Sequence, residues 1–455
     1  MVRRLFFFIA IIAVLLTACT DNDSFTTGSG NRLTFSEDTI RFDTLFSTVP
    51  SATQTFWVRN ESGDGIRIRT ARLERSNQSG YRVNVDGTYL DPVGSDFEVR
   101  KGDSILVFVE ITTRENHADE PQLVEDNLIF TLESGVEQRV NLRTYSWDAQ
   151  KITDLVVAED MTIESSVPLL IYGQGIRVEE GATLTLRNTV FYFHDGAGID
   201  AKGIVTAENC LFRGDRLDRM FDYLPYDRVS GQWKGIRLSS PNGRNTFGSC
   251  EIRNAVDAIV CDSTLLYLYD TVIHNSSGDG IYARHSTVFV DYCQLSNTYG
   301  DCLGLYGCYA QVTQSTLAQF YPFSANRGYA LYFKNTKWPM TLECMNTLVT
   351  GYADDVVMGE MADTTVVLDY HFTNCLLRTP KVEDEKRLER VIFETPKDSV
   401  QGKQHFRTVD EENLYYDFTL DSISPAFQNN IGRLPLVPEE PLSLRSYAPS
   451  LRRRR

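Results

Sequence analysis

A 22-residue repeat between Ile259 and Leu317 constrains the fold of this 455-residue chain more than any other feature. Stepping by 22 residues aligns six columns, and 16 of their 18 positions are apolar. Within each repeat the apolar residues form pairs two positions apart, which places both side chains on one face of a β-strand. The columns are Ile259, Ile281 and Leu303; Cys261, Ala283 and Leu305; Leu266, Val288 and Ala310; Leu268, Val290 and Val312; Thr271, Cys293 and Ser315; and Ile273, Leu295 and Leu317.

Three short strands per repeat predict a coil with three sides. Neighbouring coils then stack about 4.8 Å apart, and like residues lie above like residues in one continuous core. A leucine-rich repeat would need a fixed pattern of Leu and Asn that is absent, and no period near 3.6 supports amphipathic helices. We therefore predict an all-β chain whose larger part is a parallel β-helix with about 22 residues per coil.

The repeat continues less regularly outside this segment. Gly175-Ile176-Arg177-Val178 and Gly235-Ile236-Arg237-Leu238 resemble Gly280-Ile281-Tyr282-Ala283. Residues 215–232 and 320–328 break the period and are expected to project as loops. The region 148–400 resembles the right-handed parallel β-helix superfamily, which includes pectate lyases, other glycan lyases, hydrolases and epimerases. This resemblance implies a right-handed coil.

Residues 33–147 show a different pattern, with about seven short strands separated by turns. Such spacing predicts an antiparallel β-sandwich. The stretches TQTFWVRNESGDGIRI and FEVRKGDSILVFVEI resemble the Ig-like modules of the abnormal-spindle and hydin type. That resemblance implies a spacer or docking unit, and we find no catalytic cluster in this part of the sequence.

The N-terminus is typical of a secretory signal, with Arg3 and Arg4 before an apolar run that is too short to span a bilayer. Leu16-Thr17-Ala18-Cys19 resembles the bacterial lipobox. The resemblance implies that residues 1–18 are removed and that Cys19 carries lipid; the alternative is an ordinary signal with a chance cysteine. Residues 19–32 are rich in Thr, Gly, Ser and Asn and predict a flexible tether.

These features indicate a protein anchored in the outer membrane by lipid, on its periplasmic face or at the cell surface. The residues after Cys19 resemble the start of Bacteroidetes-type lipoproteins. The net charge of -16 argues against nucleic acid as a partner. Residues 401–455 are interpreted as a C-terminal cap over the last coil, followed by a basic tail; NLYYDFTLDSISPAFQNNIG resembles the closing segment of bacterial β-helix proteins.

Eight cysteines follow Cys19, and four of them fall in one inward column. Cys250 and Cys293 are two coils apart, which corresponds to about 9.6 Å, whereas a disulfide needs Cα atoms within about 7 Å. We expect mainly buried free thiols that fill the core. A pairing of Cys302 with Cys308 stays open. The four column members are Cys210, Cys250, Cys293 and Cys375.

Two polar ladders accompany the repeat. Asn254, Asn275 and Asn297 are interpreted as an asparagine ladder at a bend, with amides bonded to the next coil. The ladder of Asp257, Asp279 and Asp301 has two interpretations. Stacked carboxylates can bind Ca²⁺, or they can cap turns at a solvated bend; turn capping is favoured, and no other cofactor is expected.

Outward residues of the first strand in each coil form the candidate ligand-binding face. Aromatic rings and basic groups on one face can stack sugars and pair with carboxylates. The sequence shows no motif with the spacing of a known lyase or of a paired-aspartate hydrolase, so no catalytic residue is assigned. The candidate residues are Arg237, Asp262, Tyr282, Arg284, Tyr306, Tyr332 and Lys334.

Three functional hypotheses follow. The favoured one is an envelope lipoprotein whose side face binds polysaccharide or another envelope component. The second is a polysaccharide lyase or hydrolase acting on acidic glycans, with Arg284 and Lys334 as candidate bases and Asp262 beside them. The third is a purely structural envelope protein.

Overall fold

The computed structural model describes residues 24–118, 120–221, 223–241, 243–384 and 386–434. The chain divides into two compact units, residues 1–148 and 149–455. Each unit has its own apolar core. Cys19 and the basic tail, Arg452 to Arg455, lie outside the described residues. No helix in the described part is long and apolar enough to cross a membrane.

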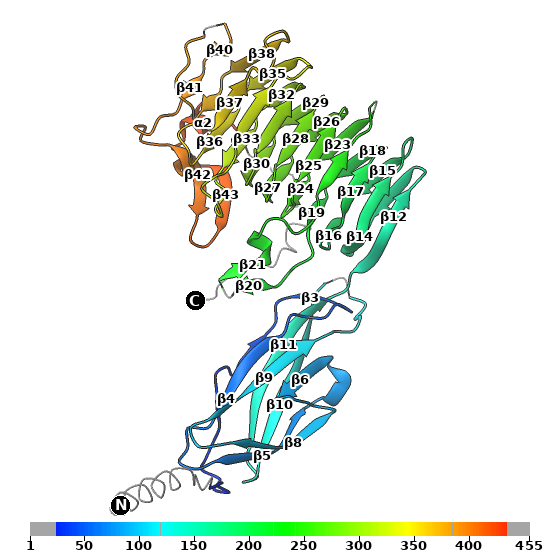
Figure 1. Ribbon diagram of the computed structural model, residues 1–455, viewed down its shortest axis with the longest axis vertical. Coiled ribbons are helices and arrows are strands. Elements are labelled where there is room, and N and C mark those ends of the chain that lie inside the picture. Colours follow the sequence, from blue (N-terminus) through cyan, green and yellow to red (C-terminus); the bar gives the residue numbers. More distant parts are fainter. Residues whose placement is uncertain (1–23, 119, 222, 242, 385, 435–455) are drawn as a thin grey trace, which may run out of the picture. The chain divides into compact units, whose positions relative to one another are not determined.

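The first unit is a two-layered β-sandwich (Figure 1). Alternating residues such as Phe56 and Val58 point into the core, while Trp57 and Arg59 point outward. Most strand pairs are antiparallel as predicted, but β2 and β3 run parallel to β11. One sheet contains β1 (Thr34–Phe35), β4 (Gln54–Arg59), β9 (Ser104–Ile111), β6 (Tyr81–Val85) and β7 (Thr88–Tyr89); the other contains β2 (Thr39–Arg41), β3 (Leu45–Phe46), β11 (Glu137–Trp147), β10 (Gln122–Leu132), β5 (Ile66–Leu73) and β8 (Val93–Val99), with η1 at Ser76–Gln78.

The second unit is a right-handed parallel β-helix, which confirms the predicted fold class (Figure 1). Ile259 pairs with Ile281 and Ile281 with Leu303, which is the predicted 22-residue register. All three are fully buried. The strands form three faces, which we call the first, second and third face in the order in which the chain visits them.

The faces contain the following strands. The first face is built from β12 (Gln150–Val157), β14 (Leu169–Val178), β17 (Gly198–Ala201), β22 (Ile236–Leu238), β25 (Ile259–Asp262), β28 (Ile281–Arg284), β31 (Leu303–Tyr306), β34 (Leu331–Lys334) and β37 (Val357–Glu360). The second face is built from β13 (Met161–Glu164), β15 (Thr183–Arg187), β18 (Ile204–Glu208), β23 (Arg244–Gly248), β26 (Leu265–Tyr269), β29 (Thr287–Asp291), β32 (Tyr309–Thr313), β35 (Met340–Met345), β38 (Leu368–Thr373) and β40 (Leu388–Glu389). The third face is built from β16 (Val190–Phe193), β19 (Leu211–Gly214), β24 (Glu251–Arg253), β27 (Val272–Ser276), β30 (Gln294–Thr298), β33 (Thr316–Gln319), β36 (Leu348–Gly351), β39 (Leu376–Leu377) and β41 (Ile392–Phe393). β12 and β14 each begin on the third face and continue onto the first, since Leu169 pairs with Phe191 of β16 and Ile176 pairs with Ile199 of β17.

Bends between the faces place many residues in the left-handed conformation. Asn254, Asn275 and Asn297 have φ values of 63°, 64° and 54° and are buried. The amide of Asn254 donates to the carbonyls of Asp227 and Val229 in an insertion. Among the residues that the structure describes, the Oδ1 atoms of Asn254 and Asn297 have no hydrogen-bond partner. For Asn254 the expected amide bond to the next coil is therefore wrong, and for Asn275 and Asn297 it stays a prediction. The bend selects asparagine for its tolerance of positive φ.

The eight cysteines after Cys19 are all buried and free. Cys302 and Cys308 do not form the pair that the sequence left open. The strand register places Cys210 and Cys250 in adjacent coils, since Leu211 pairs with Glu251. Small apolar thiols thus fill the core at positions where neighbouring coils carry Thr271 and Ser315.

The third face is covered by two segments of the chain itself. The insertion at 215–232 forms a hairpin held by Asp227, which pairs with Arg213 at 2.9 Å and Arg253 at 3.3 Å. Phe406, Phe418 and Ile431 of the C-terminal segment pack on outward residues of β33, β36 and β39. The elements are β20 (Arg219–Phe221), β21 (Leu224–Pro225) and η2 (Tyr226–Arg228) in the insertion, and η3 (Gly402–His405), β42 (Phe406–Asp410), β43 (Tyr415–Leu420) and α2 (Pro425–Gln428) in the C-terminal segment.

The C-terminal segment therefore differs from the expected cap over the last coil. Its apolar residues contact the side of the stack. There Ala318, Leu348 and Leu376 form an apolar patch on the outer surface of the third face, and the segment covers this patch. Burying that patch supplies the driving force for the packing.

Candidate functional site

The outward residues of the first face form two columns that run along the stack. The strand register aligns Arg177 with Asp200, Asp200 with Arg237, and Arg237 with Val260. Every residue predicted for the ligand-binding face belongs to one of these columns. The first column continues through Tyr282, Gly304, Tyr332 and Met358, and the second column is Asp262, Arg284, Tyr306, Lys334 and Glu360.

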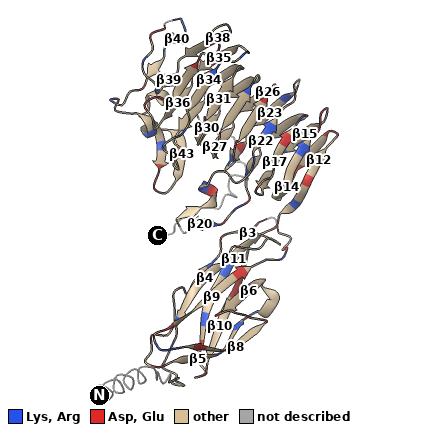
Figure 2. Ribbon diagram, viewed as in Figure 1, with Lys and Arg blue, Asp and Glu red and all other residues tan. Residues whose placement is uncertain are grey.

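Two adjoining hollows form a groove along this face. The first measures about 630 Å³ and the second about 380 Å³, and they share Arg237, Asp257 and Val260. Both basic and acidic residues lie on this part of the stack (Figure 2). Among the predicted residues, Arg237 lines both hollows and Asp262, Tyr282 and Arg284 line the second. Tyr306, Tyr332 and Lys334 lie farther along the same face.

The structure adds groove residues that the sequence reasoning missed. Asp154, Gln174, Arg177, Asp200 and Lys234 line the first hollow. They belong to coils where the 22-residue period is irregular, so their inward or outward orientation was not assigned. The similarity of the strand around Arg177 to the strand around Arg237 was the available signal, and it places Arg177 correctly.

Some charged groups of the groove form ion pairs or hydrogen bonds, and others have no such partner. Arg284 forms an ion pair with Asp262, and this hydrogen bond lowers the pKa of Asp262. Lys234 donates to Gln174 at 3.0 Å. Within the described residues, the guanidinium of Arg237 and the carboxylate of Asp200 have no hydrogen-bond or ion-pair partner, although their strands are adjacent. Both groups are exposed and therefore available to a ligand.

A ladder of tyrosines extends the groove. The ring centroids of Tyr282 and Tyr306 are 4.7 Å apart, and those of Tyr306 and Tyr332 are 5.5 Å apart. Lys334 Nζ lies 5.4 Å from the Tyr306 centroid, a cation–π distance. Gly304 makes room for this arrangement, because a Cβ at its position would meet the Tyr306 ring at 3.2 Å.

The aspartate ladder caps the backbone of successive coils. Asp257 Oδ1 accepts the backbone N–H of Asp279 at 2.9 Å, and Asp279 Oδ1 accepts that of Asp301 at 2.7 Å. Asp301 accepts the N–H of Tyr329 in the same way. In the part of the chain that the structure describes, no three His, Cys, Asp or Glu side chains are grouped to hold a metal ion. The observed contacts are those of turn capping, and the calcium interpretation stays a prediction.

Burial raises the pKa values of two aspartates in this ladder. It is the main cause that raises the pKa of Asp279 to about 7, and the neighbouring Asp301 and Asp257 add to it. Burial also raises the pKa of Asp301 to about 6. Because Asp279 lines the second hollow, the groove gains one negative charge as the pH rises through this range.

We expect Asp279→Asn to reduce the loss of folding stability that the unaltered protein shows as the pH rises. A folded-state pKa above the unfolded value of about 3.9 favours the protonated carboxyl in the fold. The stabilising contribution of protonated Asp279 is fully present below pH 4 and is lost as the pH rises to about 7. The free energy of unfolding falls over this range by at most about 4 kcal/mol, which corresponds to three pKa units. Urea unfolding at pH 4.5 and pH 8 measures the difference. Asp262→Asn, at a carboxyl with a lowered pKa, should not abolish this decline.

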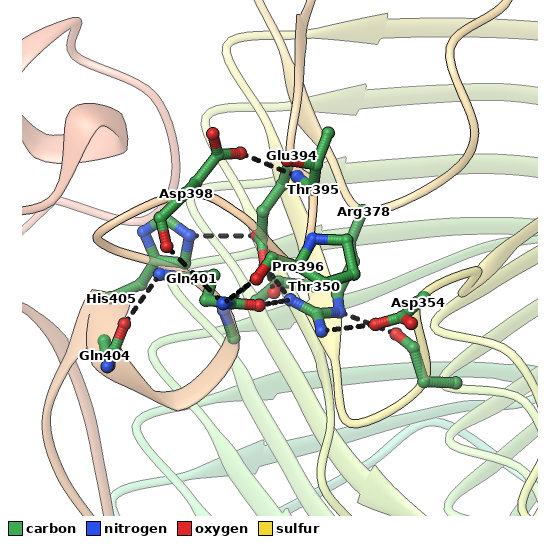
Figure 3. A network of polar contacts seen from close by, with 12 residues as sticks. Thr350, Asp354, Arg378, Glu394, Thr395, Pro396, Asp398, Gln401, Gln404 and His405 are labelled. Carbon is green, nitrogen blue, oxygen red and sulfur yellow. Dashed lines mark hydrogen bonds and ion pairs between the residues drawn. The ribbon is translucent and has the colours of Figure 1, made fainter.

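A second polar cluster lies under the C-terminal segment (Figure 3). His405 contacts Ser424 Oγ through Nδ1 at 2.7 Å and Glu394 Oε2 through Nε2 at 2.9 Å. A serine, a histidine and a carboxylate in one chain of contacts suggest nucleophilic catalysis, but all three are buried. Ser424 Oγ also accepts the N–H of Ala426 as the N-cap of α2. The cluster fastens the segment to the stack.

The comparison with protein-family models agrees with the fold of the second unit. Residues 148–317 match the family model described as right-handed β-helix region. The catalytic unit of a thermostable GH87 α-1,3-glucanase from Streptomyces thermodiastaticus strain HF3-3 is similar over 69% of this chain and 87% of that chain, with 8% sequence identity and a TM-score of 0.16. With so low a TM-score, this likeness carries no argument about fold or activity. A comparison with curated proteins found no match.

Proposed function

We propose that this protein binds an extended polysaccharide along the groove of the first face. The observation that carries the proposal is the pair of free, exposed groups, Arg237 and Asp200, at the centre of a groove that continues into the tyrosine ladder. Sugar hydroxyls both donate and accept hydrogen bonds, so they suit a lining that offers a guanidinium next to a carboxylate. Tyrosine rings supply apolar contact for sugar rings.

The length of the site supports a polymer over a small molecule. Coils stack at about 4.8 Å, close to the rise of one sugar unit in an extended chain, so successive sugars would meet successive coils. Segments of the chain itself cover the third face, whereas the two hollows lie on the first face. We further propose that Cys19 is lipidated and holds the protein at the outer membrane, which rests on the sequence resemblance.

The charge of the lining favours a neutral polymer over the acidic glycans of the enzyme hypothesis. Arg177, Lys234 and Arg237 in the first hollow are balanced by Asp154, Asp200 and Asp257. A lyase also needs a base that is free to accept a proton. Of the two candidate bases, Arg284 is engaged by Asp262, and Lys334 lies against the Tyr306 ring and lines neither hollow. Binding without chemistry is therefore the better-supported function.

Affinity electrophoresis tests the proposal. We expect purified protein to be retarded by at least one of the neutral polymers laminarin, mannan and dextran, and not by the acidic polymer polygalacturonate. Arg237→Ala should weaken that binding by about tenfold or more, the equivalent of one charge-assisted hydrogen bond. Arg187→Ala is the matched control, because Arg187 is an exposed arginine on β15 of the second face.

Two results would contradict the proposal. One is the absence of retardation by all three neutral polymers, whether or not polygalacturonate binds, and the other is an equal loss of binding in Arg237→Ala and Arg187→Ala. Incubation of the same polymers with the protein, followed by assays for new reducing ends and for ultraviolet-absorbing unsaturated products, distinguishes binding from catalysis.

A further inference from the structure

The sandwich carries a hollow of its own, independent of the groove on the β-helix. It measures about 570 Å³ and is lined by the outward residues Trp57 and Arg59 of β4 and by the turn before β9. Its volume falls in the range of small-ligand sites. Trp57 and Arg59 on β4 point to the same side of the sheet because they are two positions apart. Glu61 and Asp103 complete its charged lining.

The walls of this hollow are held in place by hydrogen bonds. Asn60 is buried, and its amide donates to the carbonyls of Asp64 at 2.8 Å and Val99 at 2.9 Å. The backbone of Asn60 also exchanges hydrogen bonds with Asp103 and Gly102, each at 3.0 Å. These bonds join the turn after β4 to the turn before β9. A ligand would therefore meet a preformed site and cause little ordering on binding.

The groups that can recognise a ligand keep free hydrogen-bonding capacity. Glu61 accepts from Thr34 through Oε2, and Asp103 accepts the backbone N–H of Ser104 through Oδ1, so each carboxylate has a second oxygen for a ligand. Trp57 is 42% exposed, although tryptophan is usually well buried. Within the described residues, neither its indole N–H nor the guanidinium of Arg59 has a hydrogen-bond or ion-pair partner. The rim of the hollow is open at Gly102, where a Cβ would meet nothing within 4 Å.

We propose that this hollow is a second saccharide-binding site, specific for a neutral sugar. The indole of Trp57 provides a flat apolar surface for the face of a sugar ring. Arg59 donates to the ring hydroxyls, and the carboxylates of Glu61 and Asp103 accept from them. The two carboxylates outnumber the one guanidinium, so an acidic sugar is repelled.

The strand pairing argues against a peptide as the occupant. A peptide that added to this sheet would need the free edge of β4 beside Arg59. That edge is already paired, since Thr34 of β1 lies opposite Arg59 and Phe35 lies opposite Val58. The hollow is therefore suited to a ligand that stacks on the sheet.

Calorimetric titration of the purified full chain tests this site, with cellotetraose, mannotetraose, maltotetraose and chitotetraose as probes and tryptophan emission as a second readout. We expect at least one probe to bind and to change the emission. Trp57→Ala and Arg59→Ala should each weaken its binding by about tenfold or more. Tyr145→Ala, at an aromatic residue that is 44% exposed on β11 of the other sheet, should leave the affinity unchanged.

The proposal is overturned if none of the four tetrasaccharides binds, or if Trp57→Ala binds them as the unaltered protein does. Binding that survives Trp57→Ala but is lost in Arg237→Ala belongs to the groove of the first face and also overturns it. A peptide ligand would be indicated by saturable binding of an extended peptide with no response to any saccharide.

Discussion

Replacement Val290→Asp is expected to unfold the β-helix, whereas Tyr282→Asp is expected to leave it folded. Val290 is 1% exposed and pairs with Leu268 and Val312 in the coils on either side. A carboxylate there has no partner, and the cost of burying it unpaired exceeds about 4 kcal/mol. Tyr282 points outward on the first face and contacts Tyr306, so its loss removes only a surface contact.

Circular dichroism during denaturant unfolding measures both effects. Val290→Asp should lose the cooperative transition of the stack or shift it to much lower denaturant, while Tyr282→Asp should retain a transition close to that of the unaltered protein. Val290→Ala is the matched control, because it removes volume without adding charge, and its cost should be roughly 1–3 kcal/mol. The opposite ranking of the two aspartate variants would reverse inside and outside and exclude the coil register described above.

The second large effect is expected at Arg378, which lies at the centre of the cluster in Figure 3. Its guanidinium pairs with Glu394 and donates to Asp354 at 2.8 Å and to the carbonyl of Ala353 at 2.7 Å. Glu394 is 3% exposed. Arg378→Met leaves that carboxylate buried without its cation, and removal of one partner of such a pair costs about 3–5 kcal/mol.

Limited proteolysis reports this loss, because the C-terminal segment should detach and become cleavable between residues 395 and 434. The double variant Arg378→Met with Glu394→Met should recover part of the stability, since it removes the buried charge together with its partner. Arg390→Met is the control, because Arg390 is exposed and pairs with Glu389 on the surface. Equal protease sensitivity of Arg378→Met and Arg390→Met would contradict the fastening role.

The same cluster should release the segment in acid. Burial alone would raise the pKa of Glu394, but its bonds to His405, Gly402 and Arg378 outweigh burial, so the pKa is lowered. A lowered folded-state pKa stabilises the fold above the unfolded value of about 4.3, and this contribution is lost as the pH falls below that value. Protease sensitivity of the C-terminal segment measured from pH 7 to pH 3 should rise in this lower range.

The local sequence pattern was sufficient to predict the repeat and the inward residues of the β-helix. The step from Ile259 to Ile281 to Leu303 is strict, and an inward position in a stacked coil accepts only apolar or small residues. The outward columns followed from the same alternation, which is why Arg237, Tyr282 and Tyr306 were placed on one face. The period failed where insertions shift the register, as between Ala201 and Ile236, and the residues Asp200 and Lys234 were missed there.

The groove and the covering of the third face depend on contacts between residues far apart in the chain. No local pattern indicates that Phe418 packs beside Leu348, or that Arg378 meets Glu394 and His405, because such pairs are selected by shape and charge after the stack has formed. Likewise, the sequence shows that Arg284 and Asp262 are one coil apart, but only the side-chain geometry decides that they pair while Arg237 and Asp200 stay free. The sequence by itself determined the coil, since each coil repeats one backbone path over a common core. The tertiary structure alone decided which side surface is open to a ligand, since exposure is a property of the whole packed chain.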